Sequence, residues 1–470
     1  MNDALRHREL IVSGSVDRAI LHLGVPAALA ALLQAGFLVV DTFWLGRVGA
    51  VAIAAASTAG FVMWLAQTLG EGAANGSGAV LANAVGAGDE AGVGRSAAAG
   101  QALAVWGSAL VSSLGLVTAH AVFVFMGTSA DVSAVGERYL WVILLGMPAY
   151  FIFAWLAAAF RATGDARTPL VLLGIAATVN LVVDPVLIFG LGPVPALGAT
   201  GAALATVVAW LASAVWGWVL LGRLGLRPRL RELVAPPMAE ITRSLRVGVP
   251  LGLEGAFFSV IYIVLTKVTT DFGTPAVAAL GIGHKLELLN YFVCAGMGAA
   301  TTTLVGQNLG AGRPMRAARA AWRTLFLTCV SVGAVTVVLV AFPDRAVAVF
   351  NGDPAVVANG TSYVLLVGMS QLFMAFEVVL LAAFAGAQWT LIPAVVEMGF
   401  TAARIPIAVL LVDVGLGVEA VWVAIAGTTV VKGSLLGLMF LVRHGRGRRR
   451  RPHVDRGSRT IPPASTEVQS

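Results

Sequence analysis

Apolar stretches long enough to cross a lipid bilayer recur along the whole chain. An α-helix needs about 20 predominantly apolar residues to span roughly 30 Å of hydrocarbon, and we count twelve such stretches, separated by short polar loops. Apolar residues make up 58% of the chain and charged residues 12%, which leaves too little polar surface to coat a water-soluble globule. Because a helix satisfies its own backbone hydrogen bonds in lipid, we predict an all-α integral membrane protein with twelve transmembrane helices.

The predicted spans form two sets of six. The first set covers residues 20–45, 48–69, 94–123, 137–160, 168–190 and 199–221. The second set covers residues 247–270, 277–305, 317–341, 356–385, 391–412 and 418–442. We therefore expect an N-terminal lobe (1–222), a cytoplasmic linker (223–246), a C-terminal lobe (247–442) and a basic, disordered cytoplasmic tail (443–470).

The distribution of Lys and Arg predicts the orientation, because these residues concentrate in cytoplasmic loops of membrane proteins. With the N-terminus inside, only Arg47, Arg138 and Arg345 fall in outward-facing loops. We therefore expect a multi-pass protein of the cell membrane with both termini in the cytoplasm. The arginine run at 448–451 follows the last span, where a cytoplasmic retention charge explains it better than nucleic-acid binding does.

Several landmarks recur at one constant offset along the sequence, which indicates an internal duplication. The recurring pairs are Gly24-Val25-Pro26 with Gly248-Val249-Pro250, Gly86-Ala87-Gly88 with Gly310-Ala311-Gly312, Tyr139 with Tyr363, Ala158-Ala159-Phe160 with Ala382-Ala383-Phe384, and Pro169 with Pro393. Each half has an even number of spans, so both halves keep the same orientation. We expect two pseudo-symmetric six-helix lobes, related by an axis along the membrane normal, with the substrate path between them.

Ionisable side chains inside the spans are candidates for function, since each costs a few kcal/mol in hydrocarbon and normally faces a bundle interior or a water-filled cavity. We count seven acids and four bases, so the interior is net acidic. The acids are Asp41, Glu71, Asp184, Glu254, Glu287, Glu377 and Glu397, and the bases are Lys267, Lys285, Arg404 and Lys432.

Polar residues of the first half share a depth in the membrane. Asp41 and Asp184 lie roughly 9 Å before the outer ends of their helices, and Thr206 lies roughly 12 Å after the start of its helix, at about 1.5 Å per residue. Asn180 precedes Asp184 by one helical turn, and Gln34 shares a helix face with Asp41. We therefore expect these side chains to meet in the outer half of the N-terminal lobe.

This set of groups suits a small hard cation. It offers two carboxylates, an amide oxygen, a hydroxyl and a backbone carbonyl freed by Pro185, all of which are oxygen ligands of the kind that Na⁺ requires. A proton would serve equally, because two close carboxylates in a poorly solvated pocket hold one proton between them.

The alternative is that each polar group only bonds a neighbouring helix and holds the bundle together. At the offset of the internal repeat, Asp41, Asn180 and Asp184 correspond to Leu265, Arg404 and Ala408. Packing alone does not require such asymmetry, although divergence without function could also produce it.

Nearly the whole chain resembles the multidrug and toxic compound extrusion family. The stretches that carry the resemblance are 24–46 with Pro26, Asp41 and the Trp-Leu-Gly that follows, the Gly86-Ala87-Gly88-Asp89 loop, the Arg161-Ala162-Thr163-Gly164-Asp165-Ala166-Arg167-Thr168-Pro169 run, the 180–185 run, and 201–206. The resemblance implies V-shaped lobes and antiport of organic cations against H⁺ or Na⁺.

The resemblance also implies site residues. Asp41, Asn180, Asp184 and Thr206 match the coupling-ion positions of the family, and Pro26 matches a proline associated with bending of the first helix. The second half departs from one branch of the family, because Phe258 stands where that branch has a glutamate and Glu254 lies one turn earlier. This favours the branch similar to the DNA-damage-inducible protein F and puts a second-lobe cation site in doubt.

The carboxylates of the second half allow two interpretations. In the first, Glu254, Glu287 and Glu377 line a drug cavity, and Gln34 and Pro26 of the first half are further candidates for lining the site. The second interpretation is internal ion pairing, because Lys285 is two residues from Glu287 and Arg404 lies two helical turns from Glu397.

Two other functions are weighed against the antiporter. A lipid or lipid-linked oligosaccharide flippase of the same architecture should line its cavity with several arginines, and here the intramembrane acids outnumber the bases. An intramembrane enzyme should carry clustered Asp or a His/Asp pair, whereas His120 and His284 are isolated in the sequence. We expect a monomeric transporter, not an enzyme, that needs no cofactor besides its coupling ion and acts on small, cationic, amphiphilic substrates.

Overall fold

A computed structural model describes residues 2–227 and 230–449, and the described chain consists of helices joined by loops. One bundle contains α2 (Val16–Val48), α3 (Ala50–Ala87), α4 (Glu90–Phe125), α5 (Ala130–Ala162), α6 (Arg167–Phe189) and α7 (Ala199–Arg223). The other contains α9 (Met238–Thr270), α10 (Thr274–Gly310), α11 (Pro314–Ala341), α13 (Pro354–Gly368), α14 (Gln371–Gly386), α15 (Leu391–Asp413) and α16 (Glu419–Arg449). Three short helices, α1 (Asn2–Val12), α8 (Leu230–Val234) and α12 (Pro343–Ala348), complete the described part.

The predicted fold class is confirmed. Within the described residues, eleven helices are long and apolar enough to cross a membrane, and the number becomes twelve when α13 and α14 count as one span. These two helices meet at a bend of 53°. The tenth predicted span is therefore a broken helix rather than a continuous one.

Several boundaries differ from the sequence predictions. The glycine-rich stretch after residue 69 stays helical to the end of α3, because its glycines pack against neighbouring helices. The expected linker contains α8 and the start of α9. The last helix, α16, continues to Arg449, so residues 443–449 are helical rather than a disordered tail. The remainder of the predicted tail, 450–470, lies outside the described residues.

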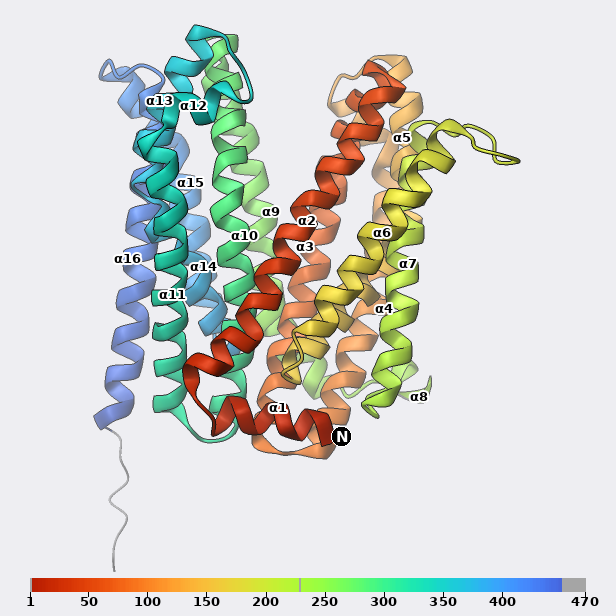
Figure 1. Ribbon diagram of the computed structural model, residues 1–470, viewed down its shortest axis with the longest axis vertical. Helices are drawn as coiled ribbons and strands as arrows, with labels where there is room; N and C mark the ends of the chain where they lie inside the picture. Colours follow the sequence, from red (N-terminus) through yellow and green to blue (C-terminus); the bar gives the residue numbers. More distant parts are fainter. Residues whose placement is uncertain (1, 228–229, 450–470) are drawn as a thin grey trace, which may run out of the picture.

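The two bundles pack together at the end that carries the N-terminus and diverge toward the opposite end (Figure 1). The contact is made mainly by α3 against α9 and by α10 against α2 and α3. Where α3 crosses α9, glycine faces glycine: a Cβ atom on Gly76 would lie 2.6 Å from the backbone nitrogen of Gly248, and one on Gly72 would lie 2.8 Å from that of Gly252. The missing side chains allow the backbones to approach closely, as small residues do at helix contacts in membranes.

Local sequence explains the sharp turn between α3 and α4. Gly88 ends α3 in the left-handed conformation with φ +71°, which a residue without a Cβ adopts at little cost. Asp89 then caps α4, accepting a hydrogen bond from the Gly92 backbone nitrogen at 2.9 Å. The Gly86–Asp89 motif of the sequence is therefore a helix-stop and helix-start signal.

The N-terminal helix α1 was not expected, and it contacts both bundles at the end where they meet (Figure 1). The Arg8 guanidinium donates to the Val85 carbonyl at 2.9 Å and to the Gly86 carbonyl at 2.8 Å, at the end of α3. From α11, Arg316 donates to the Ile11 carbonyl at 2.9 Å and to the Gly14 carbonyl at 2.6 Å. We call α1 and residues 13–14, which follow it, the strap.

Candidate functional site

The candidate site lies in the first bundle between α2, α6 and α7. Helix α6 packs against both α2 and α7. Asn180 and Asp184 stand one turn apart on α6 and are 1% and 0% exposed, and Thr206 of α7 is also buried. Asp41, near the end of α2, is half-buried. Because a buried polar group is costly unless it has a partner, the contacts of these residues decide what the site can do.

Three oxygen atoms in this site are buried and accept no hydrogen bond from any described residue: Asp41 Oδ1, Asn180 Oδ1 and Asp184 Oδ2. The other oxygen of Asp184, Oδ1, accepts a hydrogen bond from Asn180 Nδ2 at 3.1 Å. Asp41 lies close enough for its charge to act on Asp184. Two acids and an amide therefore present unsatisfied oxygens to a common region.

No basic side chain of the described residues, 2–227 and 230–449, forms an ion pair with Asp41 or Asp184. Two uncompensated carboxylates at close range repel each other, and a proton or a cation between them removes the repulsion. The geometry thus suits reversible binding of one positive charge.

Tyr139 is a residue of this region that the search for charged and amide side chains missed. It lies on α5 and is 3% exposed. It is close enough to Asp41 and Asp184 to interact electrostatically with both. An aromatic residue in an apolar helix usually belongs to the packed core. The residue type of Tyr139 alone therefore did not indicate a role in the site. The repetition of Tyr139 as Tyr363 in the second half was the one indication in the sequence.

Two of the expected lining residues lie apart from this group. Gln34 is exposed. Pro26 precedes Asp41 by fifteen residues within the continuous helix α2, which places it roughly 22 Å away along the helix axis. Pro26 is thus near the contact with α10, where a Cβ on Gly296 would meet the backbone of Ala28 at 2.5 Å.

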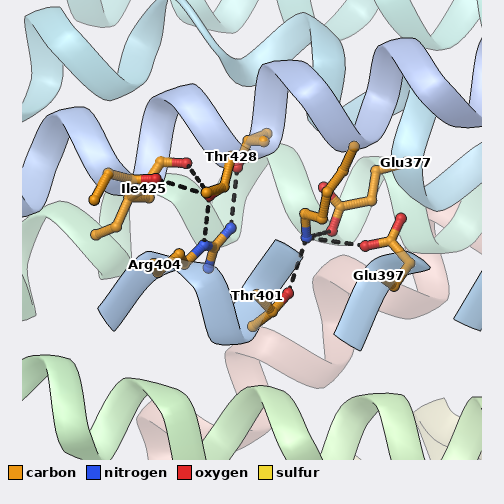
Figure 2. A network of polar contacts seen from close by, with 9 residues as sticks. Glu377, Glu397, Thr401, Arg404, Ile425 and Thr428 are labelled. Carbon is orange, nitrogen blue, oxygen red and sulfur yellow. Dashed lines mark hydrogen bonds and ion pairs between the residues drawn. The ribbon is translucent and has the colours of Figure 1, made fainter. Parts of the chain in front are cut away.

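The second bundle holds a different polar arrangement, in which acids have a built-in counter-ion (Figure 2). Lys432 of α16 is fully buried, and its ammonium nitrogen lies 2.5 Å from Glu377 Oε1 and 2.9 Å from Glu397 Oε2. The same nitrogen donates to Thr401 Oγ1 at 3.2 Å. Glu254 of α9 is half-buried near this group and interacts electrostatically with Lys432.

Arg404 belongs to the same region of α15 and is 3% exposed. Its Nε and one terminal nitrogen donate to the hydroxyls of Thr428 and Thr429, each at 3.0 Å (Figure 2). Its guanidinium carbon lies 5.9 Å from the ring centres of Phe258 and Tyr262. Lys432 therefore neutralises Glu397, a role for which spacing along one helix suggested Arg404.

Glu287 is separate from the Lys432 group and forms no ion pair with Lys285 in the described chain. Its carboxylate accepts hydrogen bonds from the Tyr363 hydroxyl and from Gln371 Nε2, each at 2.9 Å. His284 Nδ1 lies 3.6 Å from the same carboxylate. The second-half acids therefore occupy two environments, one with a buried lysine and one with a tyrosine hydroxyl, a glutamine amide and an imidazole as neighbours.

Comparisons with known proteins agree with this architecture. The sequence model of the MatE family matches residues 26–186 and again residues 250–410, two segments separated by the same offset as the landmarks of the internal repeat. The probable multidrug resistance protein NorM of Thermotoga maritima is 28% identical over 432 residues, which cover 91% of this chain and 92% of the relative.

A second relative and a solved structure extend the match. The probable multidrug resistance protein NorM of Deinococcus radiodurans is 30% identical over 451 residues, covering 92% of this chain and 96% of the relative. A crystal structure of MATE in the straight conformation superposes with a TM-score of 0.88 at 21% identity, covering 94% of this chain and 99% of that chain. The fold of this chain therefore resembles that of the solved structure over nearly its whole length.

Proposed function

We propose that this chain, which belongs to the MatE family, is a secondary antiporter that exports small organic cations in exchange for H⁺ or Na⁺. The observation that carries the proposal is the group of buried, unsatisfied oxygens of Asp41, Asn180 and Asp184 in the first bundle. Relatives described as multidrug resistance proteins support the export of small organic compounds.

In the proposed cycle, one coupling ion binds among Asp41, Asn180, Asp184 and Thr206 while the bundles diverge at the end far from the N-terminus. The bound charge removes the repulsion between the two carboxylates, so α2, which carries Asp41 and also packs against α10 of the other bundle, can change its packing. Coupling requires that the ion bind one state of the transporter more tightly than the other. Binding of the organic cation to the alternate state then completes the exchange.

The two buried bases of the second bundle, Lys432 and Arg404, weigh against a flippase for anionic lipid-linked substrates. Such a flippase needs accessible Lys or Arg side chains to hold its phosphate groups. Lys432 is fully buried between two carboxylates, and Arg404 is buried against threonine hydroxyls. Lys432 is therefore already paired with carboxylates and Arg404 is buried, so neither side chain is accessible to a phosphate group of a substrate.

The proposal also covers the cellular location, the oligomeric state, the cofactor and the branch of the family. The Lys and Arg pattern supports a cell membrane location with both termini in the cytoplasm. The chain acts as a monomer in this proposal and uses no cofactor besides the coupling ion. The branch similar to the DNA-damage-inducible protein F remains a prediction that rests on Phe258 and Glu254.

Transport by the purified chain in proteoliposomes tests the proposal, with ethidium as the probe cation and proton and sodium gradients imposed separately. We expect one of the two gradients to drive ethidium transport, and Asp41→Asn to abolish that transport while the protein is still produced and folded. Glu90→Gln, which removes an exposed carboxylate at the start of α4, is the matched control and should transport normally. Unaltered transport by Asp41→Asn would refute the coupling site.

A further inference from the structure

Two histidines face each other where the strap meets the first bundle. His7 of α1 and His22 of α2 have ring centres 5.2 Å apart, with the ring planes tilted by 44°. The turn that joins α5 to α6 lies against both of them: a Cβ on Gly164 would be 2.8 Å from the His7 Cβ, and the Gly164 backbone interacts with His22. We call His7 and His22 the histidine pair. The pair is part of the contact by which the first bundle holds the strap.

One ring nitrogen of the histidine pair has no partner. His22 Nε2 is buried and forms no hydrogen bond with any described residue. A protonated imidazole carries a hydrogen on both ring nitrogens, so a proton on His22 would leave a buried N–H group without an acceptor. A buried donor without an acceptor is costly, and a charged one more so. The packed arrangement therefore favours the neutral form of this ring.

The charges around His22 also disfavour an added proton. Three groups on neighbouring elements act on it electrostatically: His7 of the strap, Arg167 at the start of α6 and Asp165 just before that helix. The Asp165 carboxylate already accepts hydrogen bonds from the Arg167 and Thr168 backbone nitrogens, at 2.9 and 3.0 Å, and from the Thr168 hydroxyl. Because the only acid in this group is committed to the start of α6, it compensates a second cation poorly.

The other charged side chains near this end of α2 are directed elsewhere. Asp17, in the first turn of α2, pairs with Arg323 of α11 at 3.7 Å, and both side chains are 58% exposed. Arg18, one turn before His22 on the same helix, is exposed. On the strap, Arg8 donates to backbone carbonyls at the end of α3. A positive charge on both rings would therefore face His7, His22 and Arg167 with little compensation.

The strap depends on such contacts for its own structure. Helix α1 has eleven residues, and an isolated helix of that length is only marginally stable in water. The end of the strap is fixed to the second bundle, where Arg313 donates to the Val12 carbonyl at 2.8 Å in addition to the bonds from Arg316. A change at the histidine pair therefore acts on the contact with the first bundle and leaves the contact with the second in place.

We propose that the histidine pair is a pH-sensitive latch, and that protonation of His7 and His22 releases the strap from the first bundle. Two imidazolium rings at this separation repel each other. A proton binds more tightly to the released strap, where the rings reach water, so acid shifts the population toward release. Histidine changes its charge between about pH 5 and pH 8, so the latch responds to the aqueous compartment that the N-terminus faces.

The latch is separate from the candidate ion site. His22 precedes Asp41 by nineteen residues on the continuous helix α2, which places them roughly 28 Å apart along its axis. Release of the strap removes a connection between the two bundles at the end where they meet. The latch therefore controls how readily that end opens, whichever ion drives transport.

Hydrogen–deuterium exchange of the purified full-length chain in detergent tests the latch without a transport assay. The quantity measured is the protection factor, the intrinsic exchange rate at each pH divided by the observed rate, which removes the chemical effect of pH on exchange. We expect the protection factors of amides in residues 3–14 to fall by about tenfold from about pH 8 to about pH 5, because the released helix unfolds locally. Helix α12, at the opposite end of the molecule, is the internal reference and should keep its protection (Figure 1).

Four variants separate the latch from other effects of pH. His7→Gln and His22→Gln keep a neutral polar side chain and should each abolish the fall in protection, and the strap variant His7→Gln remains informative if His22→Gln does not fold. His120→Gln, which removes an exposed histidine paired with Glu137, is the matched control and should behave like the parent. Asp41→Asn should also retain the fall.

Protection that does not change with pH in the parent, or the same fall in His7→Gln as in the parent, would overturn the proposal. Loss of the fall in Asp41→Asn would assign the response to the ion site and overturn it as well. None of these results depends on whether the chain transports organic cations.

Discussion

Lys432 is the residue whose removal should affect stability most. It is fully buried, and its ammonium group compensates Glu377 and Glu397. Removing one partner from a buried ion pair leaves an uncompensated charge and typically costs about 3–5 kcal/mol. We expect Lys432→Met to lower the free energy of unfolding by about this amount, measured by denaturant-induced unfolding in detergent micelles.

Two comparisons isolate the charge effect from the change of shape. Lys285→Met alters an exposed lysine of α10 and should leave stability nearly unchanged. The triple variant Lys432→Met, Glu377→Gln, Glu397→Gln removes the whole charged group and should recover part of the lost stability. If the triple variant were less stable than Lys432→Met alone, compensation by Lys432 would not be what stabilises this region.

Single residues at equivalent positions of the internal repeat also explain why the two bundles differ chemically. Asn180 of the first half corresponds to Arg404 of the second, so one bundle has an amide where the other has a permanent cation. In the second bundle the guanidinium is fixed by Thr428 and Thr429. The first bundle has no such cation near Asp41 and Asp184 among its described residues, which leaves room for an exchangeable one.

Among the helices, the crossing of α3 and α9 depends on glycine. A Cβ on Gly76 would meet the Gly248 backbone, which cannot move without shifting a whole helix. We expect Gly76→Ala to destabilise the chain by about 1–3 kcal/mol, the usual cost of overpacking, although alanine alone favours a helix by about 1 kcal/mol over glycine. Gly60→Ala, on the same helix with no neighbouring atom within 4 Å of the added Cβ, should be neutral or stabilising in the same unfolding measurement. Equal effects of the two substitutions would contradict close backbone packing at the crossing.

Elements defined by bilayer thickness could be predicted from the sequence, and elements defined by contacts could not. Hydropathy located every span because each must supply a minimum length of apolar residues. Helix α1 was missed because its eleven residues are too few and too polar to cross the membrane. It is held by contacts with distant parts of the chain, from its own Arg8 to the end of α3 and from Arg316 of α11. The break after α13 had a weak signal in Gly368 and Ser370, residues of the kind often found at kinks.

For the candidate site, the cost of burying carboxylates selected Asp41 and Asp184, and helical spacing selected Asn180. Internal ion pairing of Glu397 was one of two interpretations, with Arg404 as the partner, because spacing relates only residues on one helix, whereas Lys432 comes from another. The hydrogen bonds from Tyr363 and Gln371 to Glu287 join residues of three helices, so they depend on packing that no local sequence pattern encodes. Both sets of contacts join different helices. They follow from tertiary structure, which spacing along one helix does not reveal.

For the molecule as a whole, the strap connects the two bundles where they meet. Arg316 of the second bundle bonds the strap, and the strap bonds α3 of the first bundle through Arg8. We expect Arg316→Ala to let this end open more often. The measurement is the alkylation rate of a cysteine placed at Ala82, which is fully buried there beside Gly306, in a chain without its two native cysteines.

Alkylation should become several times faster in Arg316→Ala, because opening exposes the buried cysteine. Arg319→Ala removes an exposed arginine one turn away and controls for the change in charge. If both arginine variants react at the rate of their parent, the strap does not hold the bundles together at this end.

The position of Lys432 also has a consequence for how the protein is made. Its acidic partners lie on α14 and α15, but the lysine itself is on α16, which leaves the ribosome after both of them. Until α16 enters the bilayer, Glu377 and Glu397 must remain protonated or hydrated, so the C-terminal bundle cannot reach its final packing before that step. A nascent chain that stops before α16 is therefore a natural target for membrane quality control.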